Sequence, residues 1–193
     1  MVPVANADNR TGIPFDWQMN VLRSDELNAW AMPGGKMAVY SGLVEKLHLT
    51  DDELAAVIGH EMNHALREHT KAQVGQQLLT GIGMQIGGAV LASQGNIDPD
   101  IIDVGSSLLA EYGIDKPFSR QHETEADIGG LMLMARAGYN PQAAISVWQK
   151  MAQAGGGSTP TFLSTHPSSA DRIAVLQQYL PEAMGIYQQG RGR

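Results

Sequence analysis

The sequence predicts an α+β fold that is mainly helical, with a small β-sheet placed over one central helix. Apolar and polar residues alternate before and after the turn at Pro33-Gly34-Gly35, which is typical of strands. A capping box over residues 50–53 then opens a helix, and apolar residues recur at helical spacing along much of the remaining chain.

The length and composition limit the classes of protein to which the chain can belong. At 193 residues it suits one domain, and we expect that domain to span 1–193, with an arm over about 1–14 and a polar tail over about 181–193. Acidic residues outnumber basic ones, 20 to 13, without a Lys/Arg stripe, so nucleic acid is not an expected partner. The chain has no cysteine, so a metal site would need His and carboxylate ligands.

The expected sheet lies in the first quarter of the chain. Its strands are predicted at residues 15–22, 28–32 and 36–40, and the last two form a hairpin through the Pro-Gly-Gly turn. A short helix follows from Ser41 or Gly42 to about His48.

The remaining chain is predicted to be helical. Thr50 and Glu53 mark the start of the central helix, because the first can cap it and the second can complete the capping box. Further helices are expected at 74–90, 100–112, 119–137 and 141–154, and from about 168 to 179, with loops at 155–160 and 162–167.

Residues 72–97 contain no charged side chain, which raises the question of a membrane span. The segment is rich in glutamine and glycine, and hydrocarbon penalises unpaired amides. We therefore expect a buried helix. The first ten residues also lack the basic and apolar regions of a signal peptide.

The central helix carries the HExxH motif, with His60, Glu61 and His64. Residues four apart lie one turn apart on the same helix face, so the two imidazoles can bind one metal ion. Glu61 would lie beside the open position of that metal, where it can take a proton from water. These residues predict a zinc hydrolase.

A catalytic zinc usually has three protein ligands, so a third is expected elsewhere. The segment SRQHETEAD offers Glu123 and Glu125, which point about 160° apart on a helix. We favour Glu123, because Asp127 lies one turn further on the same face and can orient a ligand imidazole. His122 stays a candidate, being one residue away from Glu123.

His69 follows His64 by five residues, which is about 140° around a straight helix. It cannot reach the same ion unless the helix unwinds. We therefore interpret His69 as a surface or structural residue.

A family resemblance follows from these motifs taken in order. HEMNH in a capped helix, SRQHETEAD about sixty residues later and THPSSADRI near the end resemble the zinc metallopeptidases that include the CAAX prenyl protease, HtpX and the BepA- and LoiP-type periplasmic proteases. The segment LNAWAMPGGKMAVYSGL resembles the strand with which that family holds its substrate. The match covers most of residues 17–176.

The resemblance implies a zincin-like metallopeptidase domain with one Zn²⁺ per chain and a polypeptide substrate. It assigns the third metal ligand to Glu123 and the family's aspartate to Asp127. Without clear transmembrane helices, the chain is most similar to the soluble periplasmic branch, so we expect an extracytoplasmic location in a bacterium, with the cytoplasm as the alternative. A removed leader or lipid anchor, and the oligomeric state, are left open.

The resemblance also draws attention to His166 and Arg172. His166 is expected either to donate a hydrogen bond to the oxyanion of the reaction or to act as a fourth ligand that holds the enzyme inactive. Arg172 is expected either to approach the site or the substrate carbonyl, or to form a structural ion pair.

The segment Asn28, Ala29, Trp30 and Ala31 is a candidate substrate-binding edge strand, since proteases commonly hold an extended peptide by backbone pairing. The alternative is an ordinary strand with Trp30 in the core. The predicted function is a zinc endopeptidase acting on misfolded or envelope proteins, as in protein quality control. The alternative is a zinc-containing, chaperone-like or latent module whose site is blocked by His166.

Overall fold

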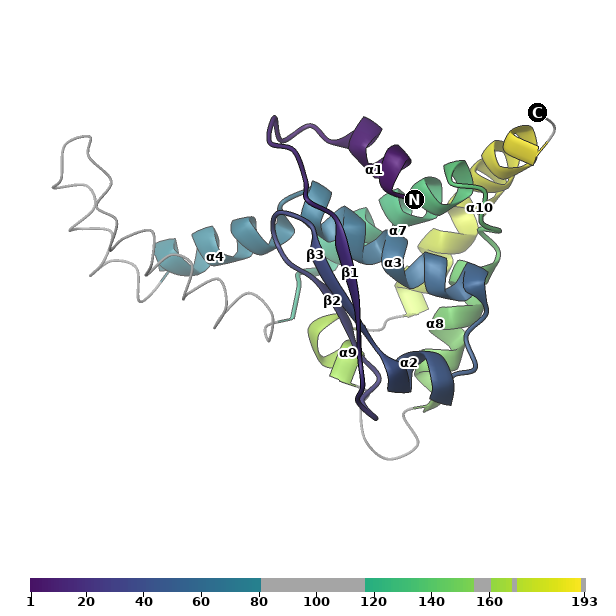
Figure 1. The fold of residues 1–193 in the computed structure, drawn as a ribbon, viewed down its shortest axis with the longest axis horizontal. Coiled ribbons are helices and arrows are strands. Elements are labelled where there is room, and N and C mark those ends of the chain that lie inside the picture. The colour runs from purple at the N-terminus through teal and green to yellow at the C-terminus, as the bar shows by residue number, and fades with distance from the viewer. Residues whose placement is uncertain (81–116, 155–160, 168–169, 192–193) are drawn as a thin grey trace, which may run out of the picture.

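The computed structural model describes residues 1–80, 117–154, 161–167 and 170–191 (Figure 1). Its sheet contains the three predicted strands, β1 (Gln18–Leu22), β2 (Ala29–Ala31) and β3 (Lys36–Tyr40), in the order β1-β3-β2. β3 pairs in parallel with β1 and antiparallel with β2, so β2 lies at an edge of the sheet.

The hairpin between β2 and β3 depends on two glycines. Gly34 and Gly35 have φ angles of 90° and 100°, a region that residues with a Cβ rarely adopt. This confirms the turn predicted at Pro33-Gly34-Gly35. In β3 the residues Met37, Ala38 and Val39 are buried, so the strand connects the sheet to the core.

The central helix α3 (Asp51–Leu66) begins as predicted, because both halves of its capping box are formed. Thr50 accepts a bond from the backbone N–H of Glu53, and the Glu53 carboxylate accepts one from the backbone N–H of Thr50. The short helix α2 (Ser41–Lys46) precedes it.

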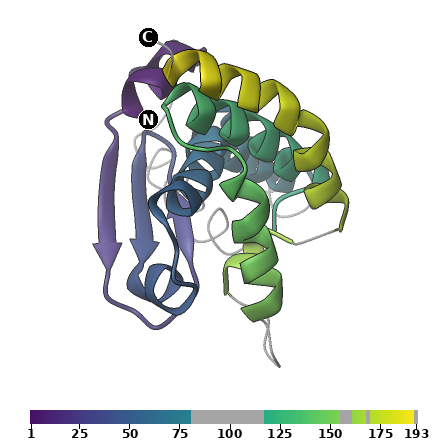
Figure 2. The same ribbon diagram turned by 90° about the vertical axis from the view of Figure 1, so that its right-hand side faces the viewer.

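The long helices that follow residue 117 form layers on the side of α3 that faces away from the sheet (Figure 2). α7 (Arg120–Arg136) packs along α3, and α10 (Ala170–Arg191) packs on α7. α8 (Ala143–Ala154) contacts both α3 and α10. The site helix α3 is therefore held between the sheet and a helical layer.

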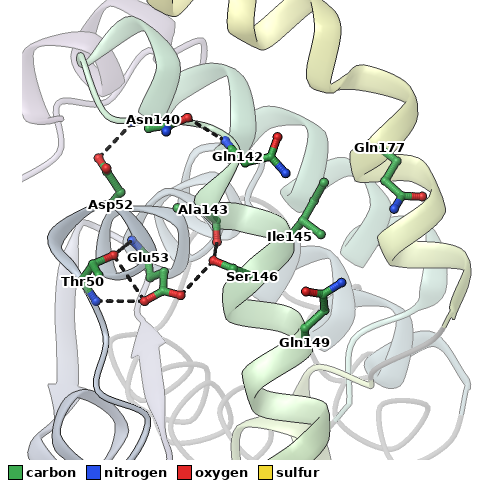
Figure 3. A pocket seen from close by; sticks show the side chains of 10 residues that line it. All are labelled: Thr50, Asp52, Glu53, Asn140, Gln142, Ala143, Ile145, Ser146, Gln149 and Gln177. Carbon is green, nitrogen blue, oxygen red and sulfur yellow. Dashed lines mark hydrogen bonds between the residues drawn. The ribbon is translucent and has the colours of Figure 1, made fainter.

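The beginning of α3 is tied to the beginning of α8 around a cavity of about 500 Å³ (Figure 3). The backbone N–H of Asn140 donates to the Asp52 carboxylate at 2.9 Å, and the Ser146 hydroxyl donates to the Glu53 carboxylate at 2.8 Å. Lys150 adds an ion pair to Glu53 at 2.7 Å. These bonds fix the start of the helix that carries HExxH.

Three helical segments differ from the sequence prediction. The expected arm over 1–14 contains α1 (Val2–Asp8), whose buried Ala5 joins an apolar cluster with Met62 and Leu133. The expected lead-in loop at 162–167 contains α9 (Thr161–Thr165), which is anchored by the fully buried Phe162.

The third difference is at the end of the chain, where α10 runs to Arg191 instead of ending near Tyr179. Residues 181–191 of the expected tail are therefore helical. α10 extends this far because an apolar stripe at helical spacing packs on the core and continues through Pro181. The stripe consists of Leu176, Leu180, Ala183 and Tyr187.

α4 (His69–Thr80) follows α3 after a break at Glu68, whose φ is 54°. The expected helix over 100–112, the loop at 155–160 and much of the expected helix over 74–90 lie outside the described residues. Within the described residues, no helix combines the length and the apolar character that crossing a bilayer requires.

Candidate metal centre

α3 turns both histidines of HExxH into the interior of the protein. The side chains of His60 and His64 are 3% and 1% exposed, and their Nε2 atoms lie 3.0 Å apart. Both rings therefore direct the same nitrogen toward one point, as their spacing of one helical turn predicts.

α7 supplies the carboxylate. Glu123 Oε1 lies 3.4 Å from His64 Nε2, and Oε2 lies 3.6 Å from His60 Nε2. Glu125 points elsewhere, with Gln121, His69 and Arg67 as its partners. Of the two glutamates considered from the sequence, the structure brings Glu123 to the histidines.

Glycines at the helix crossing make this close approach of α7 to α3 feasible. A Cβ added to Gly130 would lie 2.7 Å from the backbone nitrogen of His60, and one added to Gly59 would lie 2.9 Å from the Gly130 carbonyl oxygen. Two glycines in contact let the backbones come close enough for Glu123 to reach its neighbours.

His166 is the fourth side chain of the cluster. Its Nδ1 lies 3.0 Å from Glu123 Oε1 and 3.2 Å from His60 Nε2. One donor atom from each of His60, His64, Glu123 and His166 falls within 4.8 Å of all the others. α9 positions this ring, because the backbone N–H of His166 donates to the carbonyl of Phe162 and the two rings stack at 4.4 Å.

The donor set fits a divalent cation. His60 Nδ1 lies 3.0 Å from Asp127 Oδ1, and a proton on this Nδ1 satisfies that carboxylate. His64 Nδ1 faces His69 in the same way, at 3.0 Å. When both rings carry their proton on Nδ1, the two Nε2 atoms, which lie 3.0 Å apart, each direct a lone pair to the same point. Ligands about 2.0 to 2.2 Å from one tetrahedral ion lie about 3.3 to 3.6 Å from one another, close to the separations of 3.0 to 3.6 Å found here.

Asp127 and Arg172 surround the carboxylate side of the cluster. The guanidinium donates to both oxygens of Asp127 at 2.7 Å and also pairs with Glu123. It lies over the Trp148 ring at 3.9 Å. Burial favours the neutral acid, but hydrogen bonds from Arg172 and His60 outweigh it and lower the pKa of Asp127.

Electrostatics keep His64 and Glu123 in the forms that metal binding requires. Burial lowers the pKa of His64 well below its usual value, so this imidazole is neutral. Burial opposes ionisation of Glu123, but hydrogen bonds with His166 and His64 lower its pKa and keep it a carboxylate. Burial also opposes protonation of His166, yet Glu61 and Glu123 raise its pKa overall.

Glu61 lies at the edge of the cluster that faces the sheet. Its side chain is 4% exposed, and His166 Nε2 lies 3.3 Å from its Oε1. Burial raises the pKa of Glu61, partly offset by His166, by His60 and by a hydrogen bond from the backbone of Ala31. The bond to Ala31 connects this carboxylate to β2.

β2 lies at an edge of the sheet beside Glu61. Tyr40 N–H bonds to the Asn28 carbonyl and Met32 N–H to the Lys36 carbonyl, so the alternation of an antiparallel pair directs Ala29 and Ala31 away from β3. The amide of Asn28 accepts from the N–H of Ala29 at 2.9 Å. The structure thus places the predicted substrate segment at a sheet edge next to the cluster.

His69 was interpreted from the sequence as a surface or structural residue, and the structure contradicts the first of these alternatives. It is 3% exposed and contacts His64, so it is not a surface residue. The break at Glu68 returns the chain toward α3, whereas the prediction assumed a straight helix. The short-range sequence signal for this contact was the position of His69, five residues after the second histidine of HExxH. His122 stacks on His69 at 4.4 Å and lies outside the four-residue cluster.

Comparison with known proteins agrees with this geometry. The pattern of Peptidase family M48 matches residues 2–180. The mitochondrial metalloendopeptidase OMA1 of Schizosaccharomyces pombe is 37% identical over 169 residues, 86% of this chain and 48% of that protein. Human OMA1 is 33% identical over 179 residues, 89% and 34% of the two chains. This chain thus spans less than half of either OMA1 protein.

The chain covers a larger share of one bacterial relative than of the OMA1 proteins. Metalloprotease LoiP of Escherichia coli K12 is 32% identical over 179 residues, which is 92% of this chain and 68% of LoiP. The resemblance inferred from HEMNH, SRQHETEAD and THPSSADRI is confirmed by these matches. Since the family pattern extends over nearly the whole sequence, the chain belongs to Peptidase family M48.

Proposed function

We propose that this chain is a zinc-dependent endopeptidase that hydrolyses peptide bonds in extended polypeptides. The observation that carries the proposal is the convergence of His60, His64 and Glu123 on one point, with the buried carboxylate of Glu61 beside it. Membership of a peptidase family and relatives named as metalloendopeptidases support it.

The three side chains would hold one zinc ion, which supplies a Lewis acid for the scissile carbonyl and lowers the pKa of water. Glu61 accepts the proton of the attacking water and passes it to the leaving amine. Its raised pKa suits both steps, because a group that must release the proton again works best nearer to the ambient pH.

The outer edge of β2 would hold the polypeptide. A substrate strand would pair with the backbone of Ala29 and Ala31 once their N–H groups leave Asn28 and Glu61, and it would gain hydrogen bonds without selecting side chains. The nearness of Ala31 to Glu61 supports a substrate position beside the proposed base. Such a site accepts unfolded chains of varied sequence, which supports a role in protein quality control.

For the location, the proposal is an extracytoplasmic compartment of a bacterium, in line with the periplasmic branch of the family. The similarity of this chain to LoiP and YcaL of Escherichia coli, to which it is 32% and 30% identical, supports a bacterial setting. Cell fractionation tests it: recovery of the protein with cytoplasmic markers would overturn this location.

Replacing Glu61 by Gln tests the chemistry. The amide keeps the size of the side chain but cannot accept the proton, so we expect kcat/KM on a quenched peptide to fall about 10²- to 10⁴-fold. Zinc content, measured by mass spectrometry, should stay near one equivalent. Retained turnover would contradict the assignment of Glu61, and Glu182→Gln on the exposed part of α10 serves as the control.

A second candidate function is a latent form of the same enzyme. The position of His166 favours it, because its ring is part of the four-donor cluster and faces both Glu123 and Glu61. In that place the ring would compete with substrate and water for the space beside Glu61 and Glu123. The chain would then bind polypeptides and cleave them only after His166 moves away.

His166→Ala tests latency. Removing a blocking ring should raise casein hydrolysis about tenfold or more, and a chelator should abolish the gain. If His166 instead donates to the oxyanion, its loss should lower hydrolysis by about 10²-fold. A fall in activity would therefore reject the latent form and leave the endopeptidase proposal standing.

A further inference from the structure

The two histidines of HExxH are supported differently on the side away from the cluster. His60 Nδ1 faces the carboxylate of Asp127, whereas His64 Nδ1 faces a third imidazole, with Nδ1 of His69 at 3.0 Å. His69 Nε2 in turn lies 3.3 Å from Glu125 Oε2. His64, His69 and Glu125 thus form a continuous chain that leads away from the cluster.

The backbone break after α3 creates this contact. Arg67 ends the helix, Glu68 takes a φ of 54°, and α4 then begins at His69. On a straight helix the His69 ring would point about 140° away from His64. The reversal turns it back, so the contact depends on a conformation that costs energy for a residue with a side chain.

Aromatic rings hold both imidazoles in place. Phe118 stacks on His64 with centroids 4.1 Å apart, and His122 stacks on His69 at 4.4 Å with an interplanar angle of 12°. His69 is also 3% exposed, so water does not compete for its nitrogens. The orientation of each ring is therefore fixed before any ligand binds.

The geometry also sets the direction of each hydrogen bond. If His64 uses Nε2 in the cluster, its proton is on Nδ1, and that N–H must donate to Nδ1 of His69. The proton of the neutral His69 ring is then on Nε2, where the Glu125 carboxylate accepts it. Every donor meets an acceptor, and no proton has to lie between two donors.

We propose that His69 is a positioning residue of the metal centre, which fixes the tautomer and orientation of His64 and is itself held by Glu125. This inference rests on the proposed function, since it takes His64 as a ligand. Partners of this kind typically contribute 10- to 100-fold to metal affinity. Glu125 is 34% exposed and borders a cavity of about 700 Å³, so its own contribution is smaller than that of His69.

Two substitutions separate the hydrogen bond from simple packing. His69→Phe keeps a ring that can stack on His122 but has no acceptor for the Nδ1–H of His64. His69→Asn has its side-chain oxygen near the former Nδ1 and can still accept that proton. His122→Phe is the matched control, because it alters the same ring stack without touching His64.

Zinc affinity of the full chain is measured by competition with a chromophoric chelator. We expect His69→Phe to weaken zinc binding about 10- to 100-fold, His69→Asn to restore most of the affinity, and His122→Phe to leave it unchanged. Stoichiometry should stay at one zinc per chain in all three variants.

A second measurement does not depend on affinity. In the zinc-loaded wild type, the Nδ1–H of His64 should give a slowly exchanging proton signal in ¹⁵N-resolved NMR, and it should persist in His69→Asn but vanish in His69→Phe. Equal affinity in all variants, or equal loss in Phe and Asn, would overturn the role of His69. A wild type that binds no zinc would overturn the proposed function as well, so the two failures are distinguishable.

Discussion

Arg172 connects the two acidic side chains that α7 turns toward the histidines. Its guanidinium forms two bonds to Asp127 and a further ion pair to Glu123, and all three side chains are at most 5% exposed. A bidentate bond fixes the plane of a carboxylate as well as its position. Of the roles expected from the sequence, Arg172 thus combines two, because it both approaches the site and forms ion pairs there, and we propose that it orients both acids.

At the residue scale, Glu123 and Glu125 provide a sharp comparison because they lie two positions apart on one helix. Glu123→Ala removes a proposed ligand, so we expect less than about a tenth of the wild-type zinc content after purification. Glu125→Ala removes only a distant partner and should keep about one zinc per chain. Metal analysis of both variants checks this, and the reverse result would exchange their roles.

The sequence was sufficient for those residues whose roles follow from regular helix geometry. The spacing of His60 and His64, and the shared face of Glu123 and Asp127, need only the rotation per residue, and both predictions agree with the structure. The contact of His69 with His64 was not predicted, because it depends on the φ of Glu68. No local rule predicts that a non-glycine residue takes such a backbone conformation.

At the scale of elements, predictions succeed where a helix end carries its own signal. The cap at Thr50 lies where the sequence indicates, because its side-chain oxygen accepts a backbone N–H. α9 and the extension of α10 were missed, since Phe162 and Ala183 owe their burial to segments far away in the sequence. The contact of Gly59 with Gly130 likewise exists only once α3 and α7 pack.

The capping box leads to a prediction about pH. Burial opposes ionisation of Glu53, but bonds from Lys150, Thr50 and Ser146 outweigh it, so its pKa in the folded protein is below the ordinary 4.5. A lowered pKa stabilises the folded state above pH 4.5, and this contribution is lost as the pH falls through the folded value. Acid should therefore weaken the joint between α3 and α8 (Figure 3).

Glu53→Gln isolates this effect, because Gln can still complete a capping box but does not titrate. At pH 7 we expect the variant to be less stable than wild type by about 1 to 2 kcal/mol. The difference should shrink as the pH falls from 4.5 toward 2, in urea unfolding at each pH. A constant difference would contradict the prediction, and Glu45→Gln, at an exposed site, should match wild type throughout.

At the scale of the molecule, the proposed site connects three parts of the chain. His60 and His64 come from α3, Glu123 from α7, and His166 follows α9. A cation shared by these elements stabilises the folded state by its binding free energy, because the unfolded chain cannot form the site.

Metal removal should therefore lower the melting temperature. At a free zinc concentration 1,000 times the Kd, binding adds about 4 kcal/mol, which for a chain of this size corresponds to a shift on the order of 10 °C. Calorimetry with zinc and with chelator measures the shift. Glu123→Ala should show a much smaller one, and equal melting temperatures of wild type in both conditions would contradict a site that bridges these helices.

The distribution of the four donors along the chain also has a consequence for biosynthesis. A ribosome makes residues 60 and 64 long before residues 123 and 166, so a nascent polypeptide carries both imidazoles of HExxH without their later partners. The proposed metal site can therefore form only after residues 123 and 166 have been made, however early α3 folds.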